Sequence, residues 1–256
     1  MEEDLKKIWY DPAHPAGFGG PSKLAKASGK TLKQVRKWLK GQIAYTLNRP
    51  VRRKFNTRAY RVGGINDLWQ MDLMEMIPYA KINKGYKYIL TCIDVFSRFA
   101  RAVPMQNKTA KETSDAISKM IKKDKPFHIQ TDLGKEFYNS TVKQLFKQHG
   151  INHYSVNSQF KASLVERFNR TLRERMNKLF TARGNKKWVG VLPSIIESYN
   201  NSVHRGIGMK PVEVTKENEM KIWESQNQTE SKSKVKYKVG DYVRISKVKG
   251  PFLKNF

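Results

Sequence analysis

Three acidic side chains that could act together in catalysis lie in three distant segments of the chain: Asp72, Asp132 and Glu166. Asp72 falls inside the apolar run 68–77 (LWQMDLMEMI), although aspartate is disfavoured within strands. Asp132 directly follows the apolar segment 127–131, at the end of a predicted strand, where ligands of α/β sheets gather. Glu166 lies early in a predicted helix. If folding brings the three carboxylates together, they repel one another unless a cation lies between them.

The chemistry that such a site could perform follows from its donor atoms and from the composition of the chain. Hard carboxylate oxygens suit Mg²⁺ or Mn²⁺, and two such ions about 3.5–4 Å apart would promote an in-line phosphoryl transfer. The chain has 50 Lys and Arg against 22 Asp and Glu, a net charge of +28. This excess favours a polyanionic partner, and nucleic acid is the first candidate. An acidic membrane surface is the competing partner, but the sequence has neither an apolar spanning run nor a signal peptide.

The cysteine count excludes further kinds of site. Cys92 is the single cysteine, so the chain cannot form an intrachain disulfide or a Cys-rich structural zinc site. It lies in an apolar run, which predicts a small buried side chain in a protein of a reducing compartment.

The segment that carries Glu166, residues 155–178, predicts a turn followed by a long amphipathic helix. Its apolar stripe repeats at spacings of three and four residues: Leu164, Val165, Phe168, Leu172, Met176 and Leu179. Glu166, Asn169 and Arg173 share a different face. Two interpretations remain open, either a functional face that places one carboxylate among cations or an ordinary solvated face with Glu166–Arg170 as an ion pair.

The hydrophobic pattern predicts the elements that must position these residues. Strands are expected at 68–77, 86–95, 99–104, 127–131 and 151–155, and helices at 109–122, 139–149 and 188–202 besides the Glu166 helix. Thr109 is the expected N-cap of its helix, and the Lys84-Gly85 turn predicts an antiparallel hairpin. This order predicts an α/β domain with a mixed five-stranded sheet flanked by helices.

Residues 1–47 predict a small helical module ahead of that domain. A helical piece at 23–28 and a glycine turn precede a capping box, Thr31 to Gln34, which opens a second helix at 32–40. Leu32, Val35, Trp38 and Leu39 are expected on its inner side. The basic residues of this helix are Lys33, Arg36, Lys37 and Lys40. They could enter a major groove as part of a helix-turn-helix-like DNA-binding module, or they could form a solvated face of a generic helical hairpin.

A basic linker is expected at 48–64, and its cations could lie along phosphates or simply be solvated: Arg52, Arg53 and Lys54. A polar linker is expected at 223–235. The tail, 236–256, contains one convincing strand, VGDYVRI, and is interpreted as a partial Src-homology-3-like or chromodomain-like β segment.

Several segments together resemble a known family. They are WQMDLMEM, TCIDVFSRFARAVPM, QTDLGKEF, SQFKASLVERFNRTLRERM and YNNSVHRGIGMKPVEV, within residues 68–214. They resemble the DDE integrases of the retroviral-integrase superfamily, and especially the integrases of Polinton/Maverick-type transposons. The N-terminal YDPAHPAGFGG and YTLNRPVRRKF segments are similar to the same transposon group.

This resemblance implies an RNase H-like catalytic core over residues 65–222. It implies that Asp72, Asp132 and Glu166 form a catalytic triad that holds Mg²⁺ (or Mn²⁺), as two ions. It implies metal-dependent 3′-end processing and DNA strand transfer by a dimer or tetramer that binds element ends and target DNA. A nuclear or otherwise DNA-associated, intracellular location is expected, with no membrane partner.

The neighbours of the triad receive separate predictions. Four side chains are predicted to contact phosphates, with a solvated face as the alternative for each: Lys161, Asn169, Arg170 and Arg173. Asp94 and His204 are predicted to be structural, and Glu136 to shape the loop after Asp132. The chain departs from the retroviral pattern because it lacks the His-His-Cys-Cys zinc module and has NSQFK (157–161) in place of a PQSQG-like turn.

Three other interpretations of the sequence remain open. The chain could be a catalytically silent, transposon-derived DNA-binding protein. It could be an RNase H-like nuclease without joining activity, or a fragment of a longer reading frame. Strand joining, as distinct from retention on DNA, separates an integrase from the first two.

Overall fold

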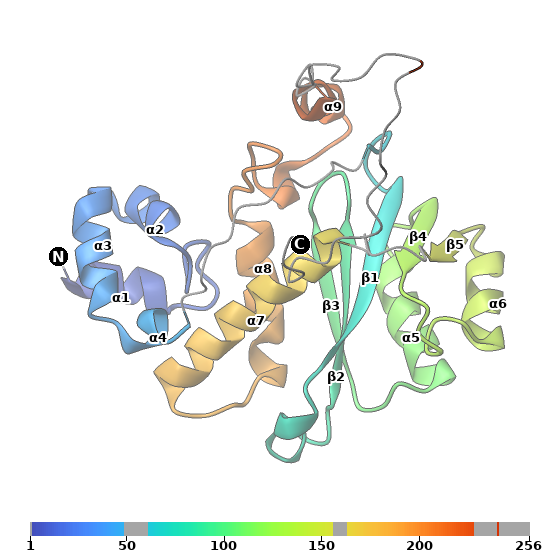
Figure 1. The fold of residues 1–256 in the computed structure, drawn as a ribbon, viewed down its shortest axis with the longest axis horizontal. Coiled ribbons are helices and arrows are strands. Elements are labelled where there is room, and N and C mark those ends of the chain that lie inside the picture. Colours follow the sequence, from blue (N-terminus) through green and yellow to red (C-terminus); the bar gives the residue numbers. More distant parts are fainter. Residues whose placement is uncertain (1, 49–60, 156–162, 228–239, 241–256) are drawn as a thin grey trace.

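The computed structural model describes residues 2–48, 61–155, 163–227 and 240, and a mixed five-stranded sheet forms its centre (Figure 1). The strands are β1 (Leu68–Glu75), β2 (Tyr88–Asp94), β3 (Ala100–Met105), β4 (His128–Thr131) and β5 (Asn152–Ser155). Their order is β3-β2-β1-β4-β5. The first three strands pair antiparallel, and β4 and β5 run parallel to β1. The predicted mixed sheet and hairpin are confirmed.

Helices cover both faces of the sheet (Figure 1). On one face α5 (Ala110–Ile121) and α6 (Ser140–Gln148) pack over Trp69 and Met71 of β1. On the other face α7 (Ser163–Arg183) and α8 (Leu192–Asn200) pack over Leu68 and Met74. Since side chains alternate along a strand, Asp72 lies on the α7 face, opposite the Trp69–Met71 side, as predicted.

The local sequence explains most element boundaries. The Thr109 side chain accepts from the backbone N–H of Glu112 at 3.3 Å, which confirms it as the N-cap of α5. All six residues of the predicted apolar stripe of α7 are buried. Cys92 is also buried, and burial raises the pKa of its thiol to about 12.

Short 3₁₀ turns shorten two of the predicted elements. The first strand ends at Glu75, because 3₁₀ turns η1 (Ile77–Tyr79) and η2 (Lys81–Asn83) form the connection to β2. The predicted helix 188–202 is divided, with a 3₁₀ turn η3 (Val189–Val191) before α8. The proline in the first turn of α8 fits this start, since proline needs no N–H there.

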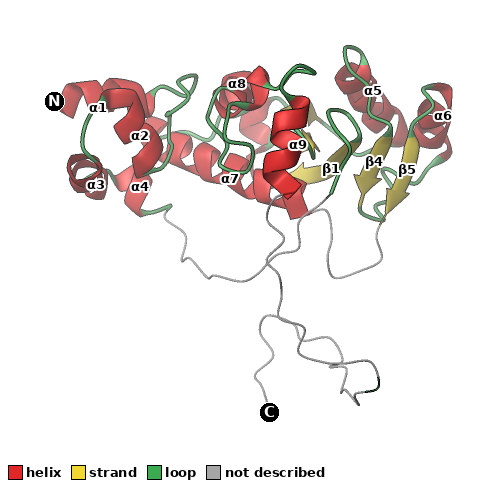
Figure 2. Ribbon diagram, turned by 90° about the horizontal axis from the view of Figure 1, so that it is seen from above, coloured by secondary structure: helices red, strands yellow, loops and turns green. Residues whose placement is uncertain are grey.

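The N-terminal residues form four helices that lie at one end of the molecule, beside α7 and α8 and far from α5 and α6 (Figures 1 and 2). These are α1 (Glu2–Tyr10), α2 (Pro21–Ser28), α3 (Leu32–Lys40) and α4 (Ile43–Thr46). The predicted capping box and the bounds of α3 are confirmed. The prediction that Leu32 faces inward is wrong, because its side chain is 36% exposed.

This N-terminal module is not packed as a separate body. One cluster of buried side chains continues from Trp9 and Leu39 through α7 to Ile93 of the sheet. The Lys178 Nζ donates to the Phe18 carbonyl at 3.1 Å, and the Ser198 hydroxyl donates to the His14 carbonyl at 2.6 Å. The module and the α7–α8 layer therefore share one core.

The end of the described chain also packs on the core. Helix α9 (Glu219–Asn227) follows a 3₁₀ turn, η4 (Pro211–Glu213), and buries Ile222 against Phe96. The Glu219 carboxylate accepts from the Ile65 N–H at 2.5 Å. The polar linker predicted from residue 223 is therefore wrong for 223–227, which are helical. The remainder of that linker, residues 49–60, and the predicted tail strand except Gly240 lie outside the described residues. None of the helices in the described part has the length and apolar character needed to cross a membrane.

Candidate active site

Asp72 lies in the middle of β1, with its carboxylate held from two sides. Its Oδ1 accepts from the backbone N–H of Leu73 at 2.8 Å. Its Oδ2 accepts from Asn169 Nδ2, on α7, at 2.7 Å. The second contact joins the sheet to the helix that carries Glu166, because Asn169 is one turn beyond Glu166 on α7.

Asp132 comes directly after β4, the strand beside β1. Its Oδ1 accepts from the Gly134 N–H at 3.1 Å, which shapes the turn that follows the strand. Burial raises the pKa of the Asp72 carboxyl, and the negative charges of Asp132 and Glu136 raise it further, against hydrogen bonds from Leu73 and Asn169 that lower it. The negative charge of Asp132 therefore opposes ionisation of Asp72.

Glu136 belongs to this acidic group, which the sequence prediction did not foresee. It was expected only to shape the loop, and its carboxylate lies over Gly134, with atoms that would be 2.7–2.9 Å from a Cβ placed there. A residue larger than glycine at 134 would therefore displace the Glu136 carboxylate. Since Glu136 also acts electrostatically on Asp72, its spacing of four residues after Asp132 was the signal that could have revealed it.

Glu166 lies in the first turn of α7, and its side chain is exposed. An acid at this end of a helix is favoured by the helix dipole. Among the described residues, no group of three or more His, Cys, Asp or Glu side chains has the arrangement of a metal site. The structure thus places Asp132 where its charge acts on Asp72, and positions Glu166 through the backbone of α7.

Two buried glutamines connect the three acidic segments. Gln70 and Gln130 each precede an aspartate by two residues, and they are 0% and 2% exposed. The Gln70 Nε2 donates to Gln130 Oε1 at 2.9 Å. The Gln70 Oε1 accepts from the backbone N–H groups of Leu164 (3.0 Å) and Val165 (3.2 Å), at the start of α7. Neither glutamine was predicted from the sequence, although a polar side chain two positions before each aspartate in an apolar strand was the available signal.

A histidine supports the end of β4 next to Asp132. The His153 Nε2 and the Thr131 hydroxyl are 2.9 Å apart. The His153 ring contacts the rings of Tyr138 and Phe146, at centroid distances of 4.7 and 4.9 Å. Burial lowers the pKa of His153 to about 4, with a smaller contribution from Lys143, so the ring is neutral at physiological pH.

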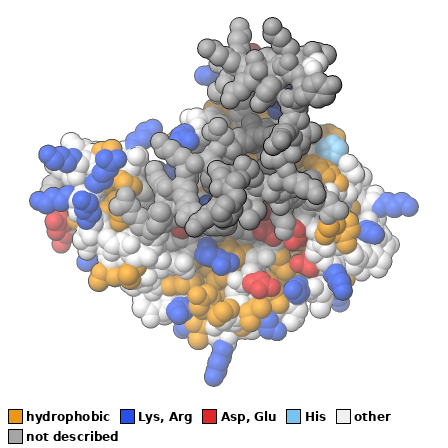
Figure 3. Space-filling model, viewed as in Figure 1, with side chains coloured by type: hydrophobic (Ala, Val, Ile, Leu, Met, Phe, Trp, Pro, Cys, Tyr) orange, Lys and Arg blue, Asp and Glu red, His pale blue; other side chains and the backbone are white. Residues whose placement is uncertain are grey.

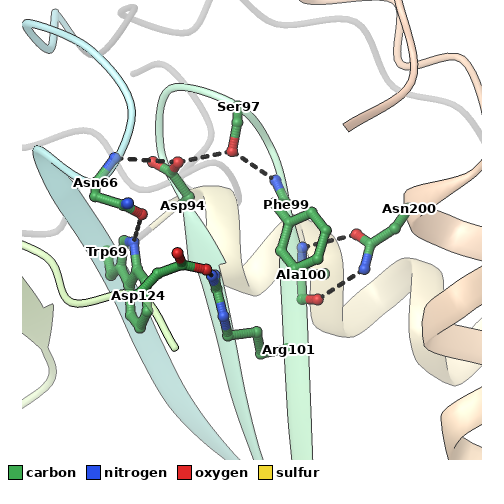
Figure 4. Close-up of polar contacts among 9 residues, drawn as sticks. All are labelled: Asn66, Trp69, Asp94, Ser97, Phe99, Ala100, Arg101, Asp124 and Asn200. Carbon is green, nitrogen blue, oxygen red and sulfur yellow. Dashed lines mark hydrogen bonds and ion pairs between the residues drawn. The ribbon is translucent and has the colours of Figure 1, made fainter. Parts of the chain in front are cut away.

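Asp94, the other strand aspartate, has a structural role (Figure 4). Its buried carboxylate accepts from the Ser97 hydroxyl at 2.7 Å and from the N–H groups of Phe96 (3.0 Å) and Asn66 (3.3 Å). The bonds from Ser97 and Phe96 close the turn between β2 and β3, and the bond from Asn66 ties this turn to the segment before β1, so the predicted structural role of Asp94 is confirmed. His204 also stabilises a turn, because its Nδ1 accepts from the Gly206 N–H at 3.1 Å.

The predicted phosphate contacts fall into three groups. The four basic residues of α3 are exposed, as are Arg170 and Arg173 on α7, and Figure 3 shows basic side chains gathered over the N-terminal module. The Asn169 amide nitrogen is bonded to Asp72, and its Oδ1 is buried without a partner among the described residues; its phosphate contact stays a prediction. The others lie outside the described residues: Lys161, Arg52, Arg53 and Lys54.

The amino-acid sequence is similar to a known protein family and to known proteins. Residues 64–157 match the family model described as Integrase core domain. The chain is 38% identical over 183 residues to a transposon-derived protein of Caenorhabditis elegans, covering 71% of this chain and 62% of that protein. It is 31% identical over 139 residues to the Gag-Pol polyprotein of feline leukemia virus, covering 52% of this chain and 8% of the polyprotein. The chain thus spans less than two thirds of each of these relatives.

Solved structures agree on the fold. The HTLV-2 integrase catalytic core domain in complex with magnesium (trimeric form) matches with a TM-score of 0.50 and 23% identity, over 60% of this chain and 97% of that one. A chain of the simian T-cell lymphotropic virus intasome in complex with a PP2A regulatory subunit matches with a TM-score of 0.54 and 19% identity, over 93% and 80%. The described sheet flanked by helices is the RNase H-like fold of integrase catalytic cores.

Proposed function

We propose that this protein is a transposon- or retrovirus-like integrase, a DDE-type polynucleotidyl transferase that processes 3′ ends and joins them to target DNA. The observation that carries the proposal is the Asp72–Asp132 pair at adjacent strands of an integrase-type sheet, with α7 bonded to the same strand. The Integrase core domain match over residues 64–157 supports it. Within the superfamily, we assign the chain to the Polinton/Maverick-type group on its sequence resemblance.

The acidic residues suit a divalent cation. Asp72 and Asp132 supply hard oxygen donors, and the charges of Asp132 and Glu136 oppose ionisation of Asp72, an opposition that a cation would remove. Asp72 and Asp132 would hold Mg²⁺ or Mn²⁺, with Glu166 as the third ligand in a site for two ions. When bound, such ions supply Lewis-acid activation of the attacking and leaving oxygens.

The protein's own residues prepare this site. The Asn169 amide fixes one oxygen of Asp72 and leaves the carboxylate in one orientation. The Gly134 N–H does the same for Asp132. Pre-oriented ligands of this kind reduce the reorganisation needed at the moment of reaction.

DNA is the proposed substrate, and the exposed cations of α3 and of α7 are the proposed contacts. The net charge of +28 supports a strongly salt-dependent association. We further propose a dimer or tetramer that bridges element ends and target DNA, in the nucleus or otherwise associated with DNA.

The test is a joining assay with purified protein, a labelled oligonucleotide duplex, supercoiled plasmid and Mn²⁺. Wild type is compared with Asp132→Asn and with Asp115→Asn, a matched change at an exposed aspartate of α5. Joined label that is lost only in Asp132→Asn supports the proposal. Nicking without joining would indicate a nuclease, and salt-dependent binding without chemistry would indicate a DNA-binding relic.

A further inference from the structure

We propose that Gln70 is a positioning residue that sets the mutual placement of the three acidic segments, so that metal affinity depends on its amide. The proposal rests on the proposed function above, and it extends that function to a residue that contacts none of the three acids. Gln70 contacts β4 and α7 at once, through opposite ends of one side-chain amide.

The register of β1 against β4 places Gln70 opposite Gln130. In the parallel pair β1–β4, Gln70 lies opposite Gln130, and both side chains point to the α7 face of the sheet. Two residues later, Asp72 lies on β1, and Asp132 comes directly after the last residue of β4. Because side chains two apart on a strand share a face, Asp72 lies on the α7 face with Gln70, and the glutamine bond joins β1 to β4 two residues before each aspartate. A change in the register of β1 against β4 would break the Gln70–Gln130 bond and also move Asp72 away from Asp132.

The start of α7 is held by the same side chain. The first backbone N–H groups of a helix have no partner within the helix, and Gln70 Oε1 accepts two of them, from Leu164 and Val165. Glu166 is the next residue. The position of Glu166 relative to β1, the strand that carries Asp72, therefore depends on Gln70.

The chemistry of the amide suits this double contact. Its oxygen accepts two N–H donors, so its nitrogen must be the end that donates to Gln130. Both glutamines are buried, and buried polar groups left unpaired are costly. A carboxylate at position 70 would keep the acceptor and lose the donor, while an aliphatic side chain would lose both. Only an amide satisfies all three segments.

The test separates positioning from ordinary packing by measuring metal affinity. The variant Gln70→Met keeps approximate volume and removes the hydrogen bonds, while Gln130→Met removes only the acceptor for Gln70. The control Val142→Ala removes buried volume from α6 on the opposite face of the sheet. The readouts are the rise in Tm on titration with Mn²⁺ or Mg²⁺, without DNA, and the metal concentration for half-maximal joining.

We expect Gln70→Met to raise the required metal concentration by about 10-fold or more, as for other outer-shell changes. The increase should be larger for Mg²⁺ than for Mn²⁺, because Mg²⁺ demands near-ideal octahedral geometry. Gln130→Met should give a smaller increase, and it provides the test if Gln70→Met does not fold. Val142→Ala should lower Tm without changing the metal concentration.

Equal metal concentrations for Gln70→Met, Gln130→Met and Val142→Ala would overturn the proposal, as would a wild-type Tm that does not respond to metal. A wild-type protein that binds Mn²⁺ but never joins DNA would refute the integrase function instead. In that case the Tm titration would still decide the role of Gln70.

Discussion

Replacing Asn169 with leucine should move the pH dependence of the reaction without unfolding the protein. The Asn169 Nδ2 donates to Asp72 Oδ2 at 2.7 Å, while its own Oδ1 is buried and has no partner in the described part of the chain. Leucine has a similar size and removes both the donor and the unpaired acceptor. Losing the hydrogen-bond donor to Asp72 lowers stability, whereas removing the unpaired buried acceptor raises it. We therefore expect little net change in Tm.

The shift follows from the charge state of Asp72. A hydrogen bond to a charged group contributes roughly 1.5–3 kcal/mol, and we take the low end, about 1.5 kcal/mol, because Asp72 is only half-buried. This corresponds to about one pH unit. Asn169 favours the anion, so its loss raises the pKa of Asp72 further above its usual range. The acid limb of activity should therefore move to higher pH by about one unit.

The sign for stability is also fixed. Because burial and two anions raise the pKa of Asp72, the folded state holds this proton more tightly than the unfolded state. Its contribution to the free energy of unfolding therefore falls as the pH rises from the usual aspartate range through the raised value. Asn169→Leu should extend this fall to higher pH.

The assay is the joining rate at fixed Mn²⁺ across the acid range, with Asn177→Leu as the control, two turns further along α7. The reasoning would be refuted if the acid limb of Asn169→Leu coincided with wild type. A shift to lower pH, or an equal shift in Asn177→Leu, would refute it as well.

Three further outcomes are expected. Gly134→Ala should lower the pKa of Asp72 and move the acid limb of joining to lower pH while changing Tm little, because a Cβ there would displace the Glu136 carboxylate, whose charge raises that pKa; an unchanged acid limb would contradict this. Replacing three cations of α3 (Lys33, Arg36 and Lys37) with alanine should weaken DNA binding, measured by fluorescence anisotropy. The slope of log affinity against log salt concentration should fall by up to about one for each phosphate that is no longer neutralised. An unchanged slope would remove α3 from the interface. His153→Leu should break the hydrogen bond to Thr131. It should nevertheless reduce the drop in Tm between pH 7 and pH 5. The pKa of His153 in the folded protein is about 4, against about 6.5 for a free histidine, so wild type loses stability as the pH falls below about 6.5.

The sequence by itself determined the elements and the side of the sheet on which Asp72 lies. Period-two alternation in β1 and the three-and-four spacing in α7 depend on residues within a few positions of one another. The capping box of α3 is likewise a bond between Thr31 and Gln34. Such features can be predicted because the interacting groups are close in the chain.

Only the tertiary structure decided how the acidic segments are joined. Gln70 meets Gln130 across 60 positions and α7 across 94, and these contacts exist only because β4 inserts beside β1 in parallel register. The packing of the N-terminal module on α7 and the nearness of Glu136 to Asp72 have the same origin. Hydrophobic periodicity specifies which face of an element is buried but not which element covers it, so the partners of these polar groups depend on strand order and helix docking.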